Sequence, residues 1–304
     1  MTKILITGVA GFIGSRVAER FVREGYDVVG VDNLSTGKLT NIPQHIEFID
    51  ADLSSKHVIS KLSKGCQKIL HLAGQSSGEI SFDDPILDLE KNTCSTLNLI
   101  RYGIDNHAER FVYASSMSVY GNVADAPIAE SIGCKPLSCY GVGKLAAEHY
   151  LNVYSSKLPF VALRMFNVYG PGQDLSNLRQ GMVSIYLAQA LAAGRIEVKG
   201  STDRFRDFIY IDDVVEAWFR AATYSSALMK TLNLGTGINT SVHTLLERLC
   251  AHIPGSTYFV QGNTPGDQSG IFADNTNIKQ CLSLMEFTTL DTGLQKMVDW
   301  ARDI

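Results

Sequence analysis

The sequence has few of the features that mark membrane or secreted proteins. No uninterrupted apolar run approaches the roughly 20 residues that a membrane-spanning helix needs. The first apolar stretch is broken by glycines at positions 8, 11 and 14. The chain passes from Met1 directly into that stretch, so no signal peptide is expected. These absences predict a protein with neither a membrane anchor nor a membrane partner.

Cysteine is scarce and is not arranged for metal binding. The six cysteines form no C-x-x-C pair, and the seven histidines show no spacing typical of a metal site. We therefore expect no metal ion. Unclustered cysteines of this kind are typical of reduced thiols in a cytoplasmic protein, where disulfides seldom form.

An excess of positive charge is absent as well. The 27 Lys and Arg residues stand against 31 Asp and Glu residues, which gives a net charge of −4. This balance argues against nucleic acid or an anionic membrane as the partner. An anionic substrate would need a local basic pocket.

Short runs rich in β-branched residues alternate with helical patterns through the first half of the chain. This alternation predicts an α/β fold with a doubly wound parallel sheet. Strands are expected at residues 3–7, 27–32, 46–50, 68–71, 110–114 and 160–164, and helices at residues 12–24, 84–107 and 138–156.

The second half of the 304-residue chain is less regular, with Pro and Gly turns between its elements. A helix is expected at residues 212–223, and a strand at 231–234 is expected to rejoin the first sheet. We predict a dinucleotide-binding domain and a smaller α/β domain that binds the substrate over the strand ends. The first comprises residues 1–164 and about 205–237, and the second about 165–204 and 238–304.

Gly8, Gly11 and Gly14 have G-x-x-G-x-x-G spacing between the first expected strand and helix. Glycine permits a tight turn, close approach of a pyrophosphate and close packing of the helix on the strand. The amino end of the helix then faces the phosphates. Alone, such a segment can be only a turn. The flanking elements, with Asp32 ending the next strand, favour a dinucleotide site.

Asp32 is placed to bind a ribose 2′-hydroxyl. Its charge would repel a 2′-phosphate, so NAD is favoured over NADP. The nearby cations Arg16 and Lys38 weaken this argument, and a solvated turn residue is the alternative. Asp52, after the third strand, is expected with Leu53 to border the adenine, and a helix N-cap is its alternative role.

Lys144 lies four positions after Tyr140 in a stretch expected to be helical. That spacing puts both side chains on one helix face. An ammonium beside a phenol favours the phenolate, so the pair predicts a tyrosine that acts as a base near neutral pH. With the dinucleotide turn, it indicates redox chemistry in which Tyr140 transfers the proton.

The ordered motifs resemble the extended short-chain dehydrogenase/reductases, an NAD-dependent epimerase/dehydratase family with a Rossmann sheet. The resemblance is strongest to nucleotide-sugar epimerases of the UDP-glucose 4-epimerase type. The matching stretches are residues 7–14, 31–37, 71–74, 115–121, 140–144, 163–172, 206–213 and 233–237. This series spans most of the chain and is more specific for the superfamily than for the reaction.

The resemblance implies catalytic roles for three residues. Tyr140 would exchange a proton with the sugar hydroxyl, Lys144 would bind the nicotinamide ribose and lower the pKa of Tyr140, and Ser116 would hydrogen-bond the reacting oxygen. Besides Tyr140 and Lys144, the implied NAD contacts are Gly8, Gly11, Phe12, Ile13, Gly14, Asp32, Asn33, Asp52, Leu53, Leu72, Ala73, Gly74 and Asn92.

The nucleotide-sugar is expected to contact Ser116, Asn167, Gln180 and Arg206. Arg206 would bind the diphosphate, because a guanidinium fork suits phosphate oxygens. An ion pair at the surface is the alternative for Arg206, and ending a strand by bonding backbone is the alternative for Ser116.

Three nearby residues are expected to be structural rather than catalytic. His71 is interpreted as a satisfied core histidine. Ser118 is expected to support its loop, and Tyr120 is expected to have a structural role.

Two departures from the family pattern bear on the reaction and on the substrate. Dehydratases and decarboxylases of the superfamily usually carry an acid two residues after the Ser/Thr, where this chain has Ser118, so both reactions are disfavoured. Many relatives carry a diphosphate-binding Arg where this chain has Thr264. Arg179 and Arg204 are candidates to replace it.

The favoured hypothesis is NAD-dependent epimerisation, at C4, of a nucleotide-activated hexose through a 4-keto intermediate, with UDP as the favoured nucleotide. A nucleotide-sugar 4-keto reductase or dehydrogenase using NAD(P)H is the alternative. A non-catalytic dinucleotide sensor or scaffold is less favoured, because the chain keeps Ser116, Tyr140 and Lys144.

Relatives commonly form homodimers by pairing two long helices, here residues 84–107 and 138–156, so a homodimer is expected. The apolar residues that these helices offer are Ile86, Leu97, Ile100, Leu145, Tyr150 and Val153. Inward packing of all six on the sheet is the alternative.

Overall fold

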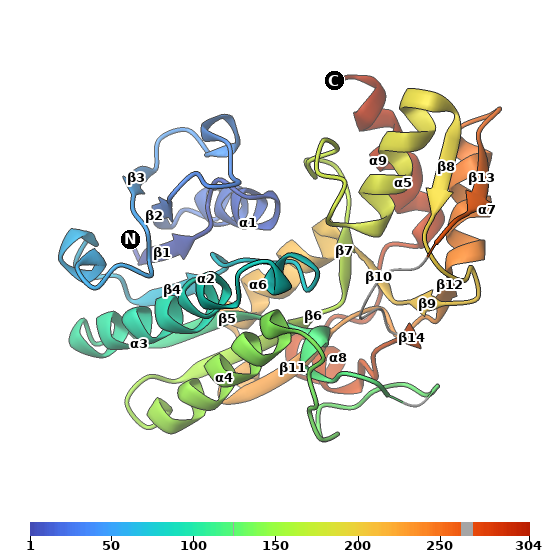
Figure 1. Ribbon diagram of the computed structural model, residues 1–304. Helices are drawn as coiled ribbons and strands as arrows, with labels where there is room; N and C mark the ends of the chain where they lie inside the picture. The colour runs from blue at the N-terminus through green and yellow to red at the C-terminus, as the bar shows by residue number, and fades with distance from the viewer. Residues whose placement is uncertain (124, 263–269) are drawn as a thin grey trace.

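The computed structural model describes residues 1–123, 125–262 and 270–304. A seven-stranded sheet with parallel pairing between neighbouring strands organises the fold (Figure 1). The strand order is β11-β6-β5-β4-β1-β2-β3. The predicted α/β fold is thereby confirmed. The strands are β1 (Lys3–Thr7), β2 (Asp27–Asp32), β3 (Glu47–Asp50), β4 (Lys68–His71), β5 (Arg110–Ser116), β6 (Phe160–Met165) and β11 (Lys230–Leu234).

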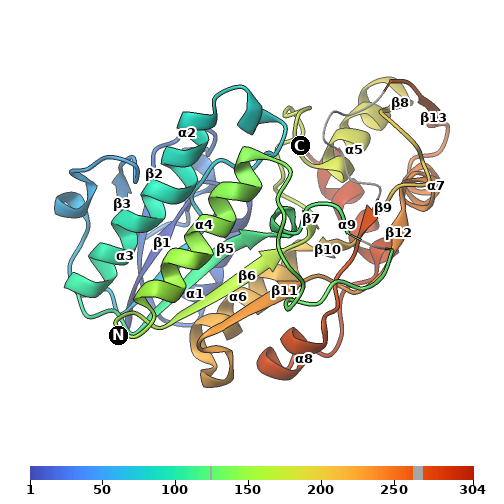
Figure 2. The ribbon, with the colours of Figure 1, turned by 60° about the horizontal axis from the view of Figure 1, so that its bottom comes forward.

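Helices cover both faces of this sheet (Figure 2). Alternate residues of β1 supply the two faces, since Ile4 and Ile6 join one apolar core and Leu5 joins the other. The first core is shared with α1 (Phe12–Arg23) and α6 (Ile211–Thr223), and the second with α3 (Ser95–Asp105) and α4 (Cys139–Tyr154). Both faces are buried, as a parallel sheet requires.

The expected strands all form, with ends that differ by one or two residues. Ile46 lies outside β3, and β5 runs on to Ser116. The last expected strand does rejoin the sheet, because β11 pairs in parallel with β6 from Lys230 opposite Val161 to Leu234 opposite Met165.

The prediction of a continuous helix over residues 84–107 is wrong. The segment contains α2 (Pro85–Leu89), a π-helical turn over Glu90–Cys94, and then α3. A π-helical turn widens the helix by one residue and is frequent at functional sites. Here it contains Asn92.

A second lobe lies beside the sheet (Figure 1). It contains α5 (Met182–Ala193), α7 (Val242–His252) and α9 (Leu290–Arg302), and its apolar residues continue the core under α1 and α6. The short strands are β7 (Asn167–Tyr169), β8 (Arg195–Val198), β9 (Phe205–Arg206), β10 (Phe208–Tyr210), β12 (Thr240–Ser241), β13 (Thr257–Val260) and β14 (Gly270–Ile271).

One element of the last segment lies against the main sheet, because α8 (Thr276–Leu282) packs on β11 and α6. The domain boundaries expected above stay a prediction. In the described residues no helix has the length and apolar character needed to cross a bilayer.

Candidate functional site

The glycine turn between β1 and α1 leaves no room for side chains at two of its glycines. A Cβ on Gly14 would lie 2.0 Å from the Gly8 carbonyl oxygen, and a Cβ on Gly8, where φ is +70°, would lie 2.8 Å from the Ala73 nitrogen. Gly11 is the N-cap of α1, and Phe12 and Ile13 form its first turn. The N–H groups of Phe12 and Ile13 lie in the first turn, where a helix offers no carbonyl partner, so the turn presents donors suited to a pyrophosphate.

Asp32 ends β2 beside this turn. Its two carboxylate oxygens accept hydrogen bonds from the backbone nitrogens of Ala10 (3.0 Å) and Leu34 (2.8 Å). The neighbouring cations are engaged by other carboxylates, since Arg16 pairs with Glu19 at 3.7 Å and Lys38 with Asp174 at 3.5 Å. This arrangement suits a ribose 2′-hydroxyl better than a 2′-phosphate.

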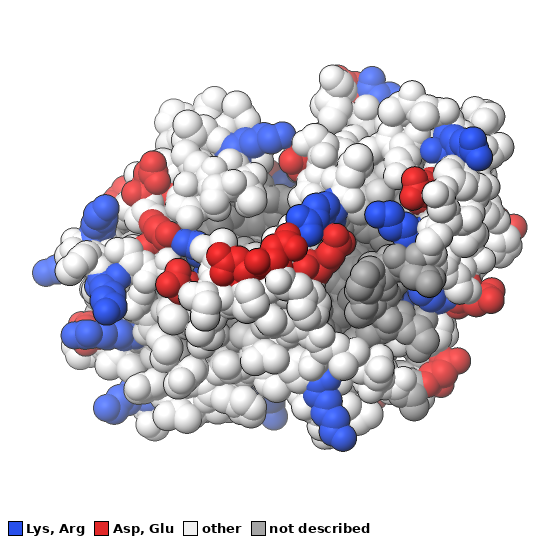
Figure 3. Space-filling model, viewed as in Figure 1, with Lys and Arg blue, Asp and Glu red and all other residues white. Residues whose placement is uncertain are grey.

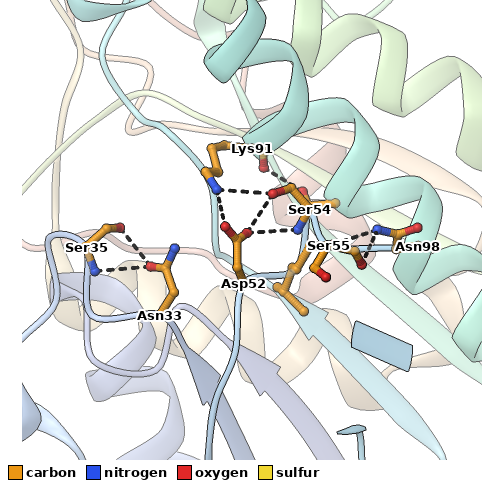
Figure 4. Close-up of polar contacts among 9 residues, drawn as sticks. Asn33, Ser35, Asp52, Ser54, Ser55, Lys91 and Asn98 are labelled. Atoms are coloured by element: carbon orange, nitrogen blue, oxygen red, sulfur yellow. Dashed lines mark hydrogen bonds and ion pairs between the residues drawn. The ribbon is translucent and has the colours of Figure 1, made fainter. Parts of the chain in front are cut away.

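Figure 4 shows the polar contacts around Asp52 at the ends of β2 and β3. The Asp52 carboxylate pairs with Lys91 and accepts hydrogen bonds from the backbone nitrogen (3.0 Å) and hydroxyl (2.7 Å) of Ser54. These contacts lower the pKa of Asp52, although burial by itself would raise it. Asp52 thus shapes a turn and is not the N-cap of a helix.

A hydrogen bond also fixes the backbone next to Asp52, since the Leu53 carbonyl accepts from the Asn98 side chain at 2.8 Å. Across the same edge of the sheet, Asn33 Oδ1 accepts bonds from the nitrogen and hydroxyl of Ser35 (Figure 4).

The loop after β4 approaches the π-helical turn closely. The Ala73 nitrogen, next to the half-buried Leu72, donates to Thr7 Oγ1 at 3.1 Å. A Cβ on Gly74 would lie 2.5 Å from Asn92 Oδ1 and 3.4 Å from Lys144 Nζ. Asn92 Oδ1 is buried, and no group of residues 1–123, 125–262 or 270–304 forms a hydrogen bond with it. An acceptor left open beside Gly74 fits a bound dinucleotide with hydroxyl groups to donate.

Tyr140 and Lys144 lie on the buried face of α4, with 8% and 4% of their surface exposed. Ser138 caps this helix by accepting a bond from the Gly141 nitrogen at 3.1 Å. The two glycines of the motif permit its close packing. A Cβ on Gly141 would lie 2.6 Å from the Ser118 carbonyl, and a Cβ on Gly143 would lie 3.3 Å from a side-chain atom of Asn92.

The pKa of Tyr140 is not lowered in the protein alone. Burial raises the pKa of Tyr140 to about 12, with a further rise from Asp88, although a hydrogen bond with Ser116 lowers it. Burial lowers the pKa of Lys144 to about 8, while Asp88 raises it. The Lys144 ammonium lies 5.6 Å from the Tyr140 ring centroid. Desolvation of the buried phenol is the largest cause of the raised pKa.

Ser116 ends β5 and is buried next to α4, with 8% of its surface exposed. Its hydroxyl accepts a bond from the Ser118 nitrogen and donates to Ser118 Oγ, both at 3.2 Å. Ser118 supports this loop as expected. Tyr120 is fully buried and donates from its hydroxyl to Asn233 at 2.6 Å, which confirms its structural role.

His71 is confirmed as a satisfied core histidine. Its ring nitrogens contact the hydroxyls of Thr7 at 2.8 Å and Thr96 at 3.1 Å. Burial, and secondarily Lys144, lowers its pKa to about 3, so the imidazole is neutral.

The expected substrate contacts come from two places. Asn167, on β7, donates to the Asp207 carbonyl at 3.1 Å, and the neighbouring Arg206 on β9 is 4% exposed. Gln180 instead lies on the loop before α5 and donates to Ser76 Oγ at 2.7 Å. Arg206 is therefore no surface residue, and burial followed by the charge of Arg204 lowers its pKa to about 10.

Figure 3 shows a hollow between the two lobes with acidic and basic side chains along its rim. The described ion pairs include Arg179 with Glu79 at 3.3 Å and with Asp83 at 2.9 Å. Arg179, on the loop before α5, thus pairs with two carboxylates of the segment between β4 and α2. Thr264, where relatives carry an Arg, lies outside the described residues.

Sequence reasoning missed Asp88, a buried acid beside the Tyr140–Lys144 pair. It is 2% exposed and accepts bonds from Gln75 at 2.8 Å and Asn92 at 3.1 Å. The four-residue spacing of Asp88 and Asn92 was an available signal, but a continuous helix would have given no reason to expect this cluster.

Comparison with known proteins gives the chain a family context. Residues 4–235 match the model of the NAD dependent epimerase/dehydratase family. A UDP-glucose 4-epimerase from Mycolicibacterium smegmatis is 33% identical over 313 residues, covering 99% of this chain and 99% of the relative.

Two solved structures extend this similarity to the fold. A UDP-glucose 4-epimerase from Thermotoga maritima, with UDP-glucose, has a TM-score of 0.95 and 30% identity, with 99% of each chain covered. A UDP-glucose 4-epimerase from Thermus thermophilus, in complex with NAD, has a TM-score of 0.90 and 31% identity, also with 99% of each chain covered.

Proposed function

The chain belongs to the NAD dependent epimerase/dehydratase family and is an NAD-dependent enzyme, and we propose that it epimerises a UDP-linked hexose at C4. The observation that carries this proposal is the buried cluster of Ser116, Tyr140 and Lys144, with Lys144 next to Gly74 in the loop after β4. Such a cluster can move a proton at a sugar hydroxyl beside a nicotinamide.

When bound, NAD would supply reversible oxidation of C4, so that the sugar passes through a 4-keto form. Tyr140 takes the proton of the 4-hydroxyl and later returns it to the keto oxygen. Ser116 holds that oxygen by a hydrogen bond throughout. Because the pKa of Tyr140 is about 12 in the protein alone, its phenolate needs positive charge nearby, and Lys144 is the cation that the chain contributes.

Epimerisation also requires the keto sugar to turn while its nucleotide stays bound. We assign the diphosphate to Arg206, whose buried guanidinium can form charge-assisted bonds with phosphate oxygens. Asn167 and Gln180 are assigned to the nucleotide-sugar on either side of it. The proposed sugar pocket therefore lies between β9 and the loop before α5, where Gln180 donates a hydrogen bond to Ser76.

The proposal is tested by incubating the purified enzyme with a panel of UDP-hexoses. NMR of the products reports stereochemistry, and absorbance at the NADH band reports net redox change. The expected result is a C4 isomer with no net change in NADH. A sustained absorbance change without an isomer would instead indicate a keto reductase or dehydrogenase, and NAD binding without any turnover would indicate a sensor.

We also propose that the enzyme is a homodimer formed through α2 and α4. Apolar side chains on these helices are exposed, including Ile86 at 65%, Val142 at 54% and Val153 at 72%. Ile100, expected in the interface, is only 1% exposed and packs inward. Light scattering should give the mass of a dimer, and a monomer at micromolar concentration would contradict the proposal.

Two further assignments remain proposals. We place the enzyme in the cytoplasm because all six cysteines are free thiols, which a reducing compartment preserves. We also keep the division into a dinucleotide-binding domain and a nucleotide-sugar-binding domain with the boundaries given above.

A further inference from the structure

We propose that Asp88 is a positioning residue that acts as the fixed counter-charge of Lys144 and anchors the loop at residues 75–77 beside it. The inference rests on the proposed function for its catalytic meaning. Asp88 comes from α2, whereas Lys144 comes from α4 and the loop follows β4. One carboxylate would thus join three separate elements at the site.

The hydrogen bonds of Asp88 use only one of its two oxygens. Oδ1 accepts from Gln75 Nε2 at 2.8 Å and from Asn92 Nδ2 at 3.1 Å. Oδ2 is buried and has no hydrogen-bond partner within the part of the chain that the structure describes. A buried carboxylate oxygen without a donor is costly, so its retention calls for a nearby positive charge or a bound group.

Gln75 transmits the position of Asp88 to the loop. The Gln75 amide nitrogen that binds Asp88 also donates to the Ser77 carbonyl at 2.7 Å. The Gln75 amide oxygen accepts a bond from the Ser77 nitrogen. The loop begins directly after Gly74, which packs against Asn92. Asp88 therefore binds the loop through Gln75 and also binds Asn92, which lies next to Gly74.

The open oxygen of Asp88 lies toward α4. A Cβ on Gly143 would be 3.5 Å from Asp88 Oδ2, and the Gly143 carbonyl accepts a bond from Thr93 at 3.1 Å. Gly143 directly precedes Lys144, so the glycine permits the carboxylate and the helix carrying the ammonium to pack closely. Among the described residues Asp88 and Lys144 form no direct ion pair, so Asp88 acts on Lys144 through its charge and not through a contact.

The other groups near Lys144 do not replace this charge. The Tyr113 ring lies 5.2 Å from Lys144 Nζ, and burial raises the pKa of Tyr113 well above its usual value, so it stays neutral. His71 is neutral as well, and Glu148, one turn along α4, is held by Arg164. In the described structure Asp88 is the charge that opposes the effect of burial on the pKa of Lys144.

The Asp88 carboxylate shifts the pKa values of Lys144 and Tyr140 in the same direction. Asp88 raises the pKa of Lys144 by stabilising the ammonium, and it raises the pKa of Tyr140 by repelling the phenolate. Removing the charge therefore lowers both pKa values. Both limbs of the activity profile would move to lower pH, whereas a loss of packing alone would lower activity without moving the limbs.

The test is Asp88→Asn, which keeps the shape and an oxygen for the bonds from Gln75 and Asn92. The protein is produced with lysine labelled with 13C at Cε, and the NMR signal of Lys144 is identified by its absence in Lys144→Ala. We expect its titration midpoint to fall by on the order of one pH unit. The control is Glu90→Gln, an exposed carboxylate two residues away, which should leave the midpoint unchanged.

An unchanged Lys144 midpoint in folded Asp88→Asn would overturn the inference. If that variant is unstable, Asp88→Ser also removes the charge and must give a shift in the same direction. The titration needs no substrate, so it is independent of turnover. Failure of every UDP-hexose to react would overturn the proposed function while leaving the Lys144 titration as a test of Asp88.

Discussion

The proposed cofactor side and the proposed sugar side of this site are built in different ways. On the cofactor side, Gly8 and Gly14 are fixed by backbone contacts, and Asp32 is held by two backbone nitrogens. On the sugar side, Gln180 and Arg179 come from a loop and reach side chains about 100 residues away in sequence, Ser76 and Glu79. Local geometry determines the first side, and long-range contacts between side chains assemble the second.

This difference explains why the type of cofactor is easier to infer from the sequence than the identity of the sugar. A turn imposed by its own backbone recurs wherever the same residues recur, so its ligand can be inferred from the motif. A pocket assembled from distant loops changes with single substitutions. Five variants sharpen or break the comparison, and they are ordered here by the size of the expected effect.

Tyr140→Phe tests the proposed proton transfer, which takes place where the cofactor side and the sugar side meet. Loss of the proton-transfer group should lower kcat by about 10²- to 10⁴-fold. NAD affinity, measured by calorimetry, should change little, because the glycine turn is intact. Tyr154→Phe, at an exposed position on the same helix, is the control. Near-normal turnover by Tyr140→Phe would exclude the proposed mechanism.

Gly14→Ala tests the rigidity of the cofactor side. The new Cβ would lie 2.0 Å from the Gly8 carbonyl oxygen, so the turn must shift. We expect a loss of about 1–3 kcal/mol in the free energy of unfolding, measured in urea, and weaker NAD binding. Gly133→Ala has open space around its Cβ and should be neutral. Equal behaviour of the two variants would show that the turn is not rigid.

Arg206→Gln tests the proposed diphosphate contact on the sugar side. Loss of a charge-assisted bond should cost about 1.5–3 kcal/mol of substrate binding. KM for the UDP-sugar should rise accordingly, and NAD affinity should stay within twofold to threefold, on the order of experimental scatter. A rise in the Kd for NAD with no change in KM would place Arg206 outside the sugar site.

Asp32→Ser tests cofactor choice. Without the carboxylate, a 2′-phosphate is no longer repelled, so the ratio of NADP to NAD affinity should rise about tenfold, or about 1.4 kcal/mol. Competition binding with the two dinucleotides measures the ratio. An unchanged ratio would indicate that Asp32 does not face the ribose.

Arg179→Ala is expected to have the smallest effect. Arg179 is about half exposed, and its pairs with Glu79 and Asp83 are solvent-screened, so the variant should change KM by less than about fivefold. A loss as large as that of Arg206→Gln would instead make Arg179 the replacement for the Arg missing at position 264.

Much of the cofactor side could be predicted from the sequence because its signals are local. Strand ends, the glycine spacing and the place of Asp32 all follow from patterns within a few residues. His71 could be interpreted as a core residue for the same reason. These features depend on backbone conformation and burial, which short patterns encode directly.

What could not be predicted depends on packing between distant segments. The π-helical turn at Asn92 packs against α4 at Gly143, a contact between distant segments that no periodicity in residues 84–107 reveals. The four-residue spacing of Tyr140 and Lys144 predicts a lower pKa for the tyrosine. The pKa rises instead because the folded protein buries the phenol, an effect that spacing does not contain.

The central claim is that the site oxidises and reduces the same carbon, C4, while Tyr140 moves only the hydroxyl proton. The most direct measurement follows a UDP-hexose that carries deuterium at C4, by NMR of the product. The account predicts that the C4 epimer forms with the deuterium retained at C4. Exchange of that deuterium with solvent during epimerisation would contradict it.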